Sequence, residues 1–481
     1  MKSFYEDESI RNKCQKFTPT EYIEIILDLA DYKQNLFGKK ILENSFGSGR
    51  ILEAIVKRYI EDCLDRNIDK KLISEGLGND LYGIELDRNL FREAKNSLNK
   101  IIHEYNLPVV KWKLLNKDAL FVSYKTKFDY IVGNPPYISY AIIDEETRKL
   151  LREKYISCSI GRFDYCYAFI ECGINLLNKK GKLVQLVPNN IFKNVFAANL
   201  RELLKKHISV IYDFSGYTMF EDTLISTSFL LYDNYNNDNY LIYENRSTKL
   251  CTKIHKEDLS GKWQFISKEK NKNRGELIRF GDLFSVSMVI ATLLNKAYIL
   301  SFDEARNKSI EKEVLRQTAS PRSLRYKKEE MIIFPYYYCN GTLMKYNKDQ
   351  FENEFPNAAN YLRLFKDKLD CRKSDINVKW FEYGRTQALS HLNQKKLLIS
   401  TIVTDKPVVY CLDKKTIPYS GIYIIVKKGS ELKFAKKIIE SEDFLAYVMR
   451  IGTSINGKSV RITSNDIENY QFLYEEINWN V

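Results

Sequence analysis

A strand, a glycine-rich loop and a helix follow one another between residues 41 and 60, and no other stretch constrains the fold as strongly. Residues 41–43 are an apolar run that ends in Glu43, the loop reads NSFGSGR, and residues 51–60 carry apolar side chains at helical spacing. This is the order of the first strand-to-helix turn in a doubly wound parallel sheet, where glycines let the backbone approach a ligand at the helix N-terminus. The first half of the chain is therefore expected to be an α/β domain.

The acidic end of this strand indicates the charge of the ligand. Glu43 closes the strand, and no third glycine follows Gly47 and Gly49 in the loop. The pattern suits a cationic or amine-bearing ligand better than a pyrophosphate. The methionine part of S-adenosylmethionine is such a ligand.

Two more carboxylates follow expected strands. The sequence LYGIELD at residues 81–87 reads as a second strand, and its Glu85 is placed to bind ribose hydroxyls. Asp118 comes after an extended stretch at 109–115, where a carboxylate could meet the amino group of an adenine. A helix cap is the alternative role of Asp118, and the sequence leaves both open.

The stretch FDYIVGNPPYISY, residues 128–140, joins a buried strand to a rigid tip. Pro135 and Pro136 fix the backbone and remove two N–H donors, so the tip presents the side-chain oxygen of Asn134 and the carbonyl of Pro135. Two such acceptors can draw the hydrogens of a planar exocyclic amine out of plane and free its lone pair for attack, while Tyr137 stacks on the ring. The alternative is a proline-stiffened turn in which Tyr137 only packs.

Strands and helices alternate through the rest of the first half, as an α/β fold requires. Pro19 is placed to open a helical run at 21–30, and residues 61–80 read as a loop or short helix. Further helices are expected at 94–102, 163–177 and 191–206, and further strands at 181–188, 209–214 and 226–232. The polar segment YNNDNY at 235–240 predicts a boundary between a catalytic domain, residues 1–240, and a second domain, residues 241–481.

The net charge of +13 is concentrated in the second half of the 481 residues. Residues 1–240 hold 34 Lys and Arg against 33 Asp and Glu, whereas residues 241–481 hold 41 against 29. Basic residues alternate with aromatic ones there, as in KWFEYGRT at 379–386, which suits a surface that touches phosphates and packs against bases. Lysine enrichment from an AT-rich genome is the alternative, but that bias would raise both halves alike. For YYY at 336–338 we expect packing in a core.

Cysteine and histidine usage predicts no metal site. The nine cysteines form no CxxC pair and the four histidines are scattered. The first residues lack the apolar core of a signal peptide, and no apolar run reaches membrane-spanning length. The expectation is a soluble cytoplasmic protein with reduced thiols.

In this order the motifs resemble those of the gamma-class N6-adenine DNA methyltransferases of the Taq type, over nearly the whole chain. That family combines a TPxE-like segment, an acidic strand end with a glycine loop, an acidic second strand, an aspartate, Asn-Pro-Pro-Tyr and a C-terminal target-recognition domain. The loop departs from the family pattern because NSF stands where DPxxGxG would begin. The resemblance implies a Rossmann-like, doubly wound methyltransferase sheet followed by a mixed α+β target-recognition domain.

The resemblance also implies the site residues. The cofactor is expected to be S-adenosylmethionine, and its contacts are expected to be Phe17, Thr18, Glu43, Gly47, Gly49, Glu85, Leu86, Asp118, Ala119, Asn134 and Pro136. The expected catalytic residues are Asn134, Pro135, Pro136, Tyr137 and Phe220. Phe220 holds the place of a phenylalanine that stacks on the flipped adenine, and a core residue is the alternative. Two segments of the second half, ATLLNKAY at 291–298 and YGRTQAL at 383–389, resemble parts of recognition domains.

The expected reaction is methyl transfer from S-adenosylmethionine to N6 of an adenine flipped out of duplex DNA, in a restriction-modification system of a bacterial or archaeal cell. The expected partners are double-stranded DNA and a cognate restriction endonuclease, with no membrane partner and a monomeric protein. A different substrate with a planar amine, such as an RNA guanine or a protein glutamine, is also compatible with the tip. So is a catalytic subunit that needs a separate specificity protein, whereas a non-catalytic DNA-binding subunit would not need Glu43, Glu85 and the tip to be intact.

Overall fold

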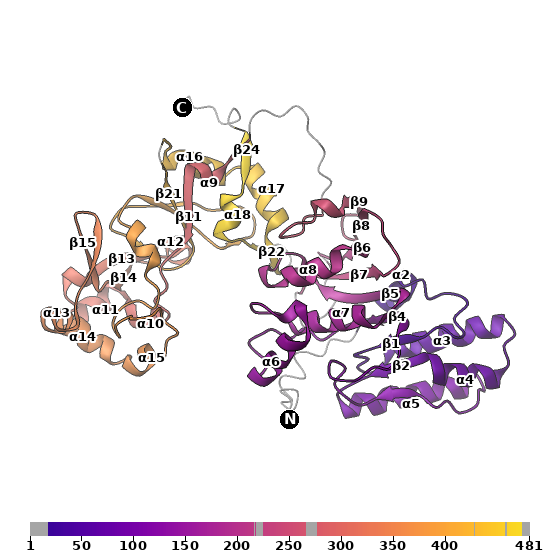
Figure 1. Cartoon of the computed structure of the whole chain (residues 1–481). Coiled ribbons are helices and arrows are strands. Elements are labelled where there is room, and N and C mark those ends of the chain that lie inside the picture. The colour runs from indigo at the N-terminus through magenta and orange to yellow at the C-terminus, as the bar shows by residue number, and fades with distance from the viewer. Residues whose placement is uncertain are drawn as a thin grey trace. The chain divides into compact units, whose positions relative to one another are not determined.

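The computed structural model describes residues 18–215, 217, 225–265, 277–427, 429–456 and 459–473. The chain divides into two compact units (Figure 1): residues 1–269 with 453–457, and residues 270–452 with 458–481. Each unit has hydrophobic cores of its own.

A nine-stranded sheet forms the centre of the first unit, with the strand order β3-β2-β1-β4-β5-β7-β6-β8-β9. β7 is antiparallel to β5 and β6, and β9 is antiparallel to β8, whereas all other neighbours in this sheet are parallel. Its strands are β1 (Ile41–Glu43), β2 (Leu81–Ile84), β3 (Lys113–Leu115), β4 (Phe128–Gly133), β5 (Leu177–Pro188), β6 (Ile208–Asp213), β7 (Thr227–Asp233), β8 (Tyr240–Asn245) and β9 (Leu250–His255).

Helices cover both faces of this sheet. Apolar stripes of the first four helices pack in one core, which includes Ile26, Ile55 and Leu98, and the remaining helices pack on the other face in a core that includes Tyr167 and Leu200. The helices are α2 (Thr20–Leu29), α3 (Arg50–Asp65), α4 (Lys70–Asp80), α5 (Arg88–Glu104), α6 (Glu145–Lys154), α7 (Tyr165–Leu176) and α8 (Ala198–Lys205), with short 3₁₀ turns η2 (Ile156–Cys158), η3 (Asn189–Phe192), η4 (Val195–Ala197) and η5 (Lys256–Asp258).

The chain order reverses between β1 and β4, which are neighbours in the sheet although β2 and β3 lie between them in sequence. Ligands of doubly wound sheets bind outside the carboxyl ends of the strands at such a point. The register pairs Glu43 with Val132, so Glu43 and the tip that follows Gly133 lie side by side at this edge. The predicted doubly wound fold is confirmed, and its topology positions the site.

Three features differ from the sequence prediction. Residues 61–80 are more helical than expected, because α3 continues to Asp65 and α4 covers Lys70–Asp80, capped by Asp69, which accepts a hydrogen bond from the Lys71 backbone. The helix expected at 191–206 is broken, because Asn194 accepts a hydrogen bond from the Phe196 backbone and starts a new turn. The first unit also takes in β8, which pairs with β6, and therefore extends past the boundary predicted at residue 240.

Small sheets and short helices build the second unit around two large hydrophobic cores and one small one, and Tyr336 is buried in a large core. Two sheets have four strands each, in the orders β11-β21-β17-β19 and β12-β14-β13-β20. The strands are β10 (Leu277–Arg279), β11 (Phe284–Met288), β12 (Ile299–Ser301), β13 (Leu315–Ala319), β14 (Glu330–Ile333), β15 (Tyr336–Cys339), β16 (Thr342–Lys345), β17 (Lys396–Ile399), β18 (Ile402–Val403), β19 (Tyr410–Leu412), β20 (Ile417–Pro418), β21 (Ile422–Val426), β23 (Ser459–Arg461) and β24 (Gln471–Leu473), while β22 (Thr453–Asn456) falls within the residues of the first unit.

The helices of the second unit are short. They are α9 (Phe280–Leu283), α10 (Asn295–Tyr298), α11 (Phe302–Asn307), α12 (Pro321–Arg325), α13 (Lys348–Glu354), α14 (Pro356–Arg363), α15 (Lys366–Asp370), α16 (Leu432–Ile439), α17 (Glu442–Ile451) and α18 (Ser464–Glu468), with 3₁₀ turns η6 (Lys312–Val314) and η7 (Gln387–His391). No helix in the described part of the chain is both long enough and apolar enough to cross a membrane.

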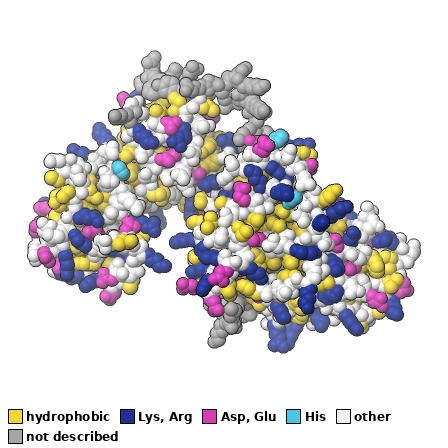
Figure 2. Space-filling model, viewed as in Figure 1, with side chains coloured by type: hydrophobic (Ala, Val, Ile, Leu, Met, Phe, Trp, Pro, Cys, Tyr) yellow, Lys and Arg dark blue, Asp and Glu magenta, His cyan; other side chains and the backbone are white. Residues whose placement is uncertain are grey.

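The charge asymmetry persists when it is counted by unit. The first unit holds 40 Lys and Arg against 37 Asp and Glu, and the second holds 35 against 25. Figure 2 shows lysine and arginine side chains on the visible face of both units. The excess of positive charge is nevertheless carried mainly by the second unit.

Candidate active site

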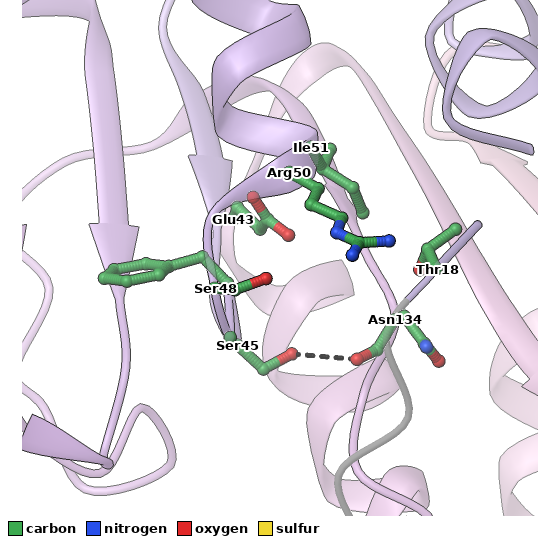
Figure 3. A pocket seen from close by; sticks show the side chains of 9 residues that line it. Thr18, Glu43, Ser45, Ser48, Arg50, Ile51 and Asn134 are labelled. Carbon is green, nitrogen blue, oxygen red and sulfur yellow. Dashed lines mark hydrogen bonds between the residues drawn. The ribbon is translucent and has the colours of Figure 1, made fainter. Parts of the chain in front are cut away.

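A pocket opens where the carboxyl ends of β1 and β4 meet (Figure 3). It spans about 300 Å³, part of which is open to solvent, and is lined by Thr18, Glu43, Ser45, Phe46, Gly47, Ser48, Arg50, Ile51 and Asn134. The glycine loop, the start of α3 and the tip after β4 therefore contribute to one site. Thr18, Glu43, Gly47 and Asn134 were expected here from the sequence, whereas Arg50 was not.

Glu43 is buried at the end of β1, and its Oε2 atom has no hydrogen-bond partner among the described residues. Burial raises the pKa of its carboxyl well above the usual value, and the charge of Glu85 raises it further, while a hydrogen bond from the Leu52 backbone acts in the opposite direction. A cation beside the ionised carboxylate would offset the cost of its desolvation. Glu43 therefore fits a positively charged group of a ligand.

Glu85 is held at the end of β2 by the backbone of two loops. The backbone N–H of Gly47 donates to its Oε2 and that of Asp87 to its Oε1, both at 2.8 Å. Burial is the main cause of its raised pKa, and these two hydrogen bonds limit the rise. Each carboxylate oxygen keeps a second lone pair that can accept a ligand hydroxyl.

Asn116 fixes the backbone next to Glu85. Its side-chain Nδ2 donates to the carbonyls of Glu85 at 2.8 Å and Leu86 at 2.9 Å. The predicted positions Glu85 and Leu86 are thus tied to the loop that carries Asp118. Asn116 was missed because it carries no motif of its own.

Asp118 caps a turn and no helix. Its Oδ1 accepts a hydrogen bond from the Leu120 backbone at 2.9 Å, and its Oδ2 accepts one from the Tyr165 hydroxyl at 3.2 Å. Burial raises the pKa of Asp118, while these hydrogen bonds and the positive charge of Lys154 lower it. Ala119 next to it is buried in the core. The helix cap considered from the sequence is therefore wrong.

The two loop glycines have different roles. Gly47 (φ +56°) lines the pocket and binds Glu85 through its N–H. Gly49 has φ +88°, and a Cβ there would lie 2.6 Å from the Cβ of Ala94 on α5. Gly49 is required by its backbone conformation and by helix packing, and its expected contact with the cofactor stays a prediction.

The tip after β4 is anchored from several sides. The Ser45 hydroxyl donates to the Asn134 carbonyl at 3.2 Å, as drawn in Figure 3. Pro135 is buried and Pro136 half-buried. The Tyr137 hydroxyl donates to the Leu186 carbonyl of β5 at 3.0 Å, and its half-buried ring packs against both cores of the unit. The ring of Tyr137 is therefore fixed in place next to Asn134.

A buried carboxylate supports the far end of the tip. Asp164 caps α7 by accepting a hydrogen bond from the Cys166 backbone at 3.1 Å, and the Ile138 backbone also donates to it. Burial raises the pKa of Asp164 to about 6 although these hydrogen bonds lower it. Sequence patterns gave no reason to connect Asp164 with the tip.

Two buried amides flank the residue before Asn134. Gln185 of β5 is paired with Gly133, and a Cβ on Gly133 would lie 3.9 Å from Asn44 Oδ1. Among the described residues, the side-chain nitrogen and oxygen of Asn44 and Gln185 have no hydrogen-bond partner. Polar groups buried in this way usually bind a water or a ligand. The sequence could not reveal them because their proximity depends on strand register.

Two predicted residues, Phe17 and Phe220, lie outside the described residues. Their expected contacts with cofactor and target base stay predictions. In the described part of the chain, the structure brings together Thr18, Glu43, Gly47 and Asn134 around the pocket and places Glu85 behind Gly47.

Comparison with known proteins finds relatives of part of this chain. Residues 32–220 match the Eco57I restriction-modification methylase family. The Type II methyltransferase M.BstVI of Geobacillus stearothermophilus is 30% identical over 208 residues, which are 41% of this chain and 37% of that protein. The Type II restriction enzyme and methyltransferase RM.Eco57I of Escherichia coli is 26% identical over 327 residues, 58% of this chain and 33% of that protein. The chain thus spans little more than a third of the length of these relatives.

Two solved structures share the fold over most of the chain. The type IIL restriction-modification enzyme MmeI, solved in complex with DNA, aligns with a TM-score of 0.61 at 14% identity, over 94% of this chain and 65% of that one. The DrdV–DNA complex aligns with a TM-score of 0.53 at 12% identity, over 93% of this chain and 54% of that one. At such identities the likeness shows the fold alone.

The methylase family implies S-adenosylmethionine as the cofactor, and the pocket fits it. The cofactor is a cation with an amino acid at one end, and the pocket offers the buried, partly unpartnered carboxylate of Glu43 together with the Arg50 side chain, which projects between Glu43 and Thr18 in Figure 3. The motif order and the doubly wound sheet agree with this likeness: residues 32–220 match the Eco57I restriction-modification methylase family.

Proposed function

We propose that the protein transfers a methyl group to the N6 amine of an adenine flipped out of duplex DNA. The observation that carries the proposal is the tip Asn134 to Tyr137, anchored at the carboxyl end of β4 beside the pocket of Glu43. S-adenosylmethionine supplies a methyl group on a positively charged sulfur, and the amine nitrogen bonds to that carbon as the carbon–sulfur bond breaks.

The residues of the pocket hold the amino-acid part of the cofactor. Glu43 binds the ammonium group, because an opposite charge offsets the desolvation that raises its pKa. Arg50 binds the carboxylate through its planar guanidinium. Glu85 accepts hydrogen bonds from the ribose hydroxyls with the lone pairs that Gly47 and Asp87 leave available.

The tip orients the target amine. The Asn134 side-chain oxygen and the Pro135 carbonyl accept the two N–H hydrogens, which frees the nitrogen lone pair for attack, and Tyr137 supplies a ring face for the base. The amine gives up its proton as the new bond forms, so no strong base is needed. A base must leave the stack to reach this site, at a cost of a few kcal/mol.

Support for DNA as the substrate comes from three directions. The second unit carries 35 Lys and Arg against 25 Asp and Glu, relatives of the first unit are restriction-modification methyltransferases, and MmeI was solved with DNA. A methyltransferase acting on an RNA guanine or a protein glutamine is the alternative that shares the tip. Dependence on a separate specificity subunit, a cognate endonuclease and the monomeric state stay predictions.

The test is transfer of labelled methyl from S-adenosylmethionine to plasmid DNA from a methylation-deficient host, followed by digestion to nucleosides. We expect the label in N6-methyl-2′-deoxyadenosine from DNA and none in RNA or protein substrates offered in parallel. Label in another nucleoside would overturn the choice of adenine, and label in RNA or protein alone would overturn DNA as the substrate.

A further inference from the structure

Three loops of the second unit meet on one face. The backbone N–H of Arg385 donates to the Ala291 carbonyl at 3.0 Å, that of Gly384 to the Thr292 carbonyl at 3.4 Å, and that of Asp375 to the Gly384 carbonyl at 2.9 Å. Residues 291–296, 373–377 and 383–388 thus form one surface, called here the three-loop platform. It lies by α10 and α15, which are near each other in Figure 1.

One guanidinium ties the platform together. The Nη1 of Arg372 donates to the Thr292 carbonyl at 2.6 Å, and its Nη2 donates to the carbonyls of Trp380 at 3.1 Å and Glu382 at 3.0 Å. Its Nε donates to the Leu369 carbonyl of α15 at 2.9 Å. Arg372 therefore binds backbone on each side of the platform and restricts how its loops can move.

The platform presents apolar side chains to solvent. Leu293 is 40% exposed with φ +58°, and Ile376 is 91% exposed next to Asn377 with φ +62°. A Cβ on Gly384 would lie 2.5 Å from Leu293 Cδ1, so only glycine permits this leucine to lie there. A leucine in the left-handed region is strained, and strain that persists on an exposed surface is typical of functional sites.

Cations outnumber carboxylates on the platform by three to one, the carboxylate being Asp375. Arg385, Lys296 and Lys373 are exposed, and in the described part of the chain none of them forms an ion pair. Exposed cations beside apolar tips on a fixed backbone are complementary to a DNA duplex. Phosphates attract lysine, base edges accept hydrogen bonds from arginine, and the thymine methyl group packs against apolar side chains.

We propose that the three-loop platform reads the target sequence, with Arg385 contacting a base edge and Leu293 and Ile376 packing against neighbouring bases. This inference rests on the proposed function, because it takes duplex DNA as the substrate. Arg385 is assigned to a base because the Ala291 carbonyl and Gly384 hold its backbone close to the apolar tips.

The test compares whole-chain variants by the adenines they modify in plasmid DNA, read by single-molecule sequencing, and by kcat/KM on a duplex with the wild-type site and on duplexes with one base pair changed. We expect Arg385→Ala to reduce discrimination at one position by about 10- to 100-fold. Glycine adopts φ +58° without strain, so we expect Leu293→Gly to fold at least as stably as wild type. The same variant should relax the base preference at a neighbouring position of the target sequence.

Arg325→Ala, which removes an exposed arginine from α12, is the matched control and is expected to leave the modified sites unchanged. If Arg385→Ala modifies the same sites with the efficiency of wild type, the inference is overturned. A uniform loss of kcat/KM on all duplexes, with the salt dependence of binding reduced by about one counterion, would also overturn the inference, because Arg385 would then contact a phosphate. Wild type that methylates no DNA at all would instead overturn the proposed function.

Discussion

The edge of the large sheet and the three-loop platform hold their functional groups in opposite ways. At the sheet edge the side chains of Glu43, Glu85 and Asp118 are withdrawn from solvent, and backbone N–H groups donate to them. At the platform the side chain of Arg372 holds backbone carbonyls, and the side chains of its neighbours extend into solvent. The first arrangement fixes acceptors for a small ligand, and the second fixes a backbone that displays side chains to a large partner.

This difference has an energetic reason. A group that must stabilise one reacting geometry gains from a dry, preorganised site, because water would otherwise compete for it. Groups that contact a polyanion gain from staying solvated until the partner arrives, because burying an unpaired charge is costly. A change in one region should therefore leave the property assigned to the other region nearly intact.

Asn134→Ala should have the largest effect and should act on the rate alone. Loss of an acceptor for the target amine is expected to reduce methyl transfer by about 10²-fold or more. Binding of the duplex should change by less than a few fold, because the proposed function gives Asn134 a role in orienting the amine and little in phosphate contact. The measurement is labelled methyl transfer beside a binding isotherm, with Asn237→Ala in the exposed β7–β8 turn as control. If Asn134→Ala keeps a turnover near that of wild type, the tip is only a structural turn.

Arg372→Met should affect stability and sequence discrimination and leave the cofactor site nearly intact. It removes four hydrogen bonds to backbone carbonyls, and we expect the free energy of unfolding to fall by about 2–3 kcal/mol while sequence discrimination weakens. The affinity for S-adenosylmethionine should stay within about twofold, since Arg372 belongs to the other unit. Calorimetric titration measures the affinity for the cofactor, and urea unfolding measures the free energy of unfolding.

Arg363→Met is the control for that variant, because the partners of Arg363 among the described residues are side chains near the surface: Asn360, Glu352 and the ring of Trp380. A loss of cofactor affinity in Arg372→Met, without loss of discrimination, would contradict the division of roles between the units.

Asp164→Asn should remove part of the pH dependence of stability. The pKa of Asp164 is raised to about 6 from 3.8, so the folded protein binds the proton more tightly than the unfolded chain. The stabilising contribution of the proton is complete below about pH 4 and is lost as the pH rises through 6. We expect the stability of wild type relative to Asp164→Asn to fall by about 2 kcal/mol between pH 4 and pH 7, measured by urea unfolding at both. If the free energies of unfolding of wild type and Asp164→Asn change in parallel with pH, Asp164 is solvated in the folded protein.

Much of the sheet edge could be predicted because its signals are local. An apolar strand that ends in Glu43, and another that ends in Asn134 and two prolines, are readable without knowing what lies beside them. The structure confirms both strands and shows that they pair with each other. The doubly wound topology then follows from the alternation of strands and helices.

The remaining features depend on register and packing across long stretches of sequence. Gln185 reaches the tip because β5 pairs it with Gly133, and Gly49 is needed because Ala94 of α5 lies against it. The platform depends on loops about 80 residues apart that a single arginine joins, as in the bond from Arg372 to Thr292. Local propensity contains no information about such neighbours, so neither the packing of Gly49 against Ala94 nor the extension of the first unit past residue 240 could be predicted.

Tyr137→Phe should have the smallest effect, and it separates the ring of Tyr137 from its hydroxyl. The hydroxyl donates to the Leu186 carbonyl at 3.0 Å, and the ring packs against both cores. Removing the hydroxyl leaves a buried carbonyl without its donor, which should lower the free energy of unfolding by about 1 kcal/mol. Methyl transfer should stay within a few fold, because the ring face that stacks on the base remains. Tyr137→Ala removes that face and should lose far more activity, since stacking on an aromatic ring is worth about 1–3 kcal/mol per base. If Tyr137→Phe loses as much activity as Tyr137→Ala, the anchoring of the tip to β5, and not the stacking surface, is what the reaction requires.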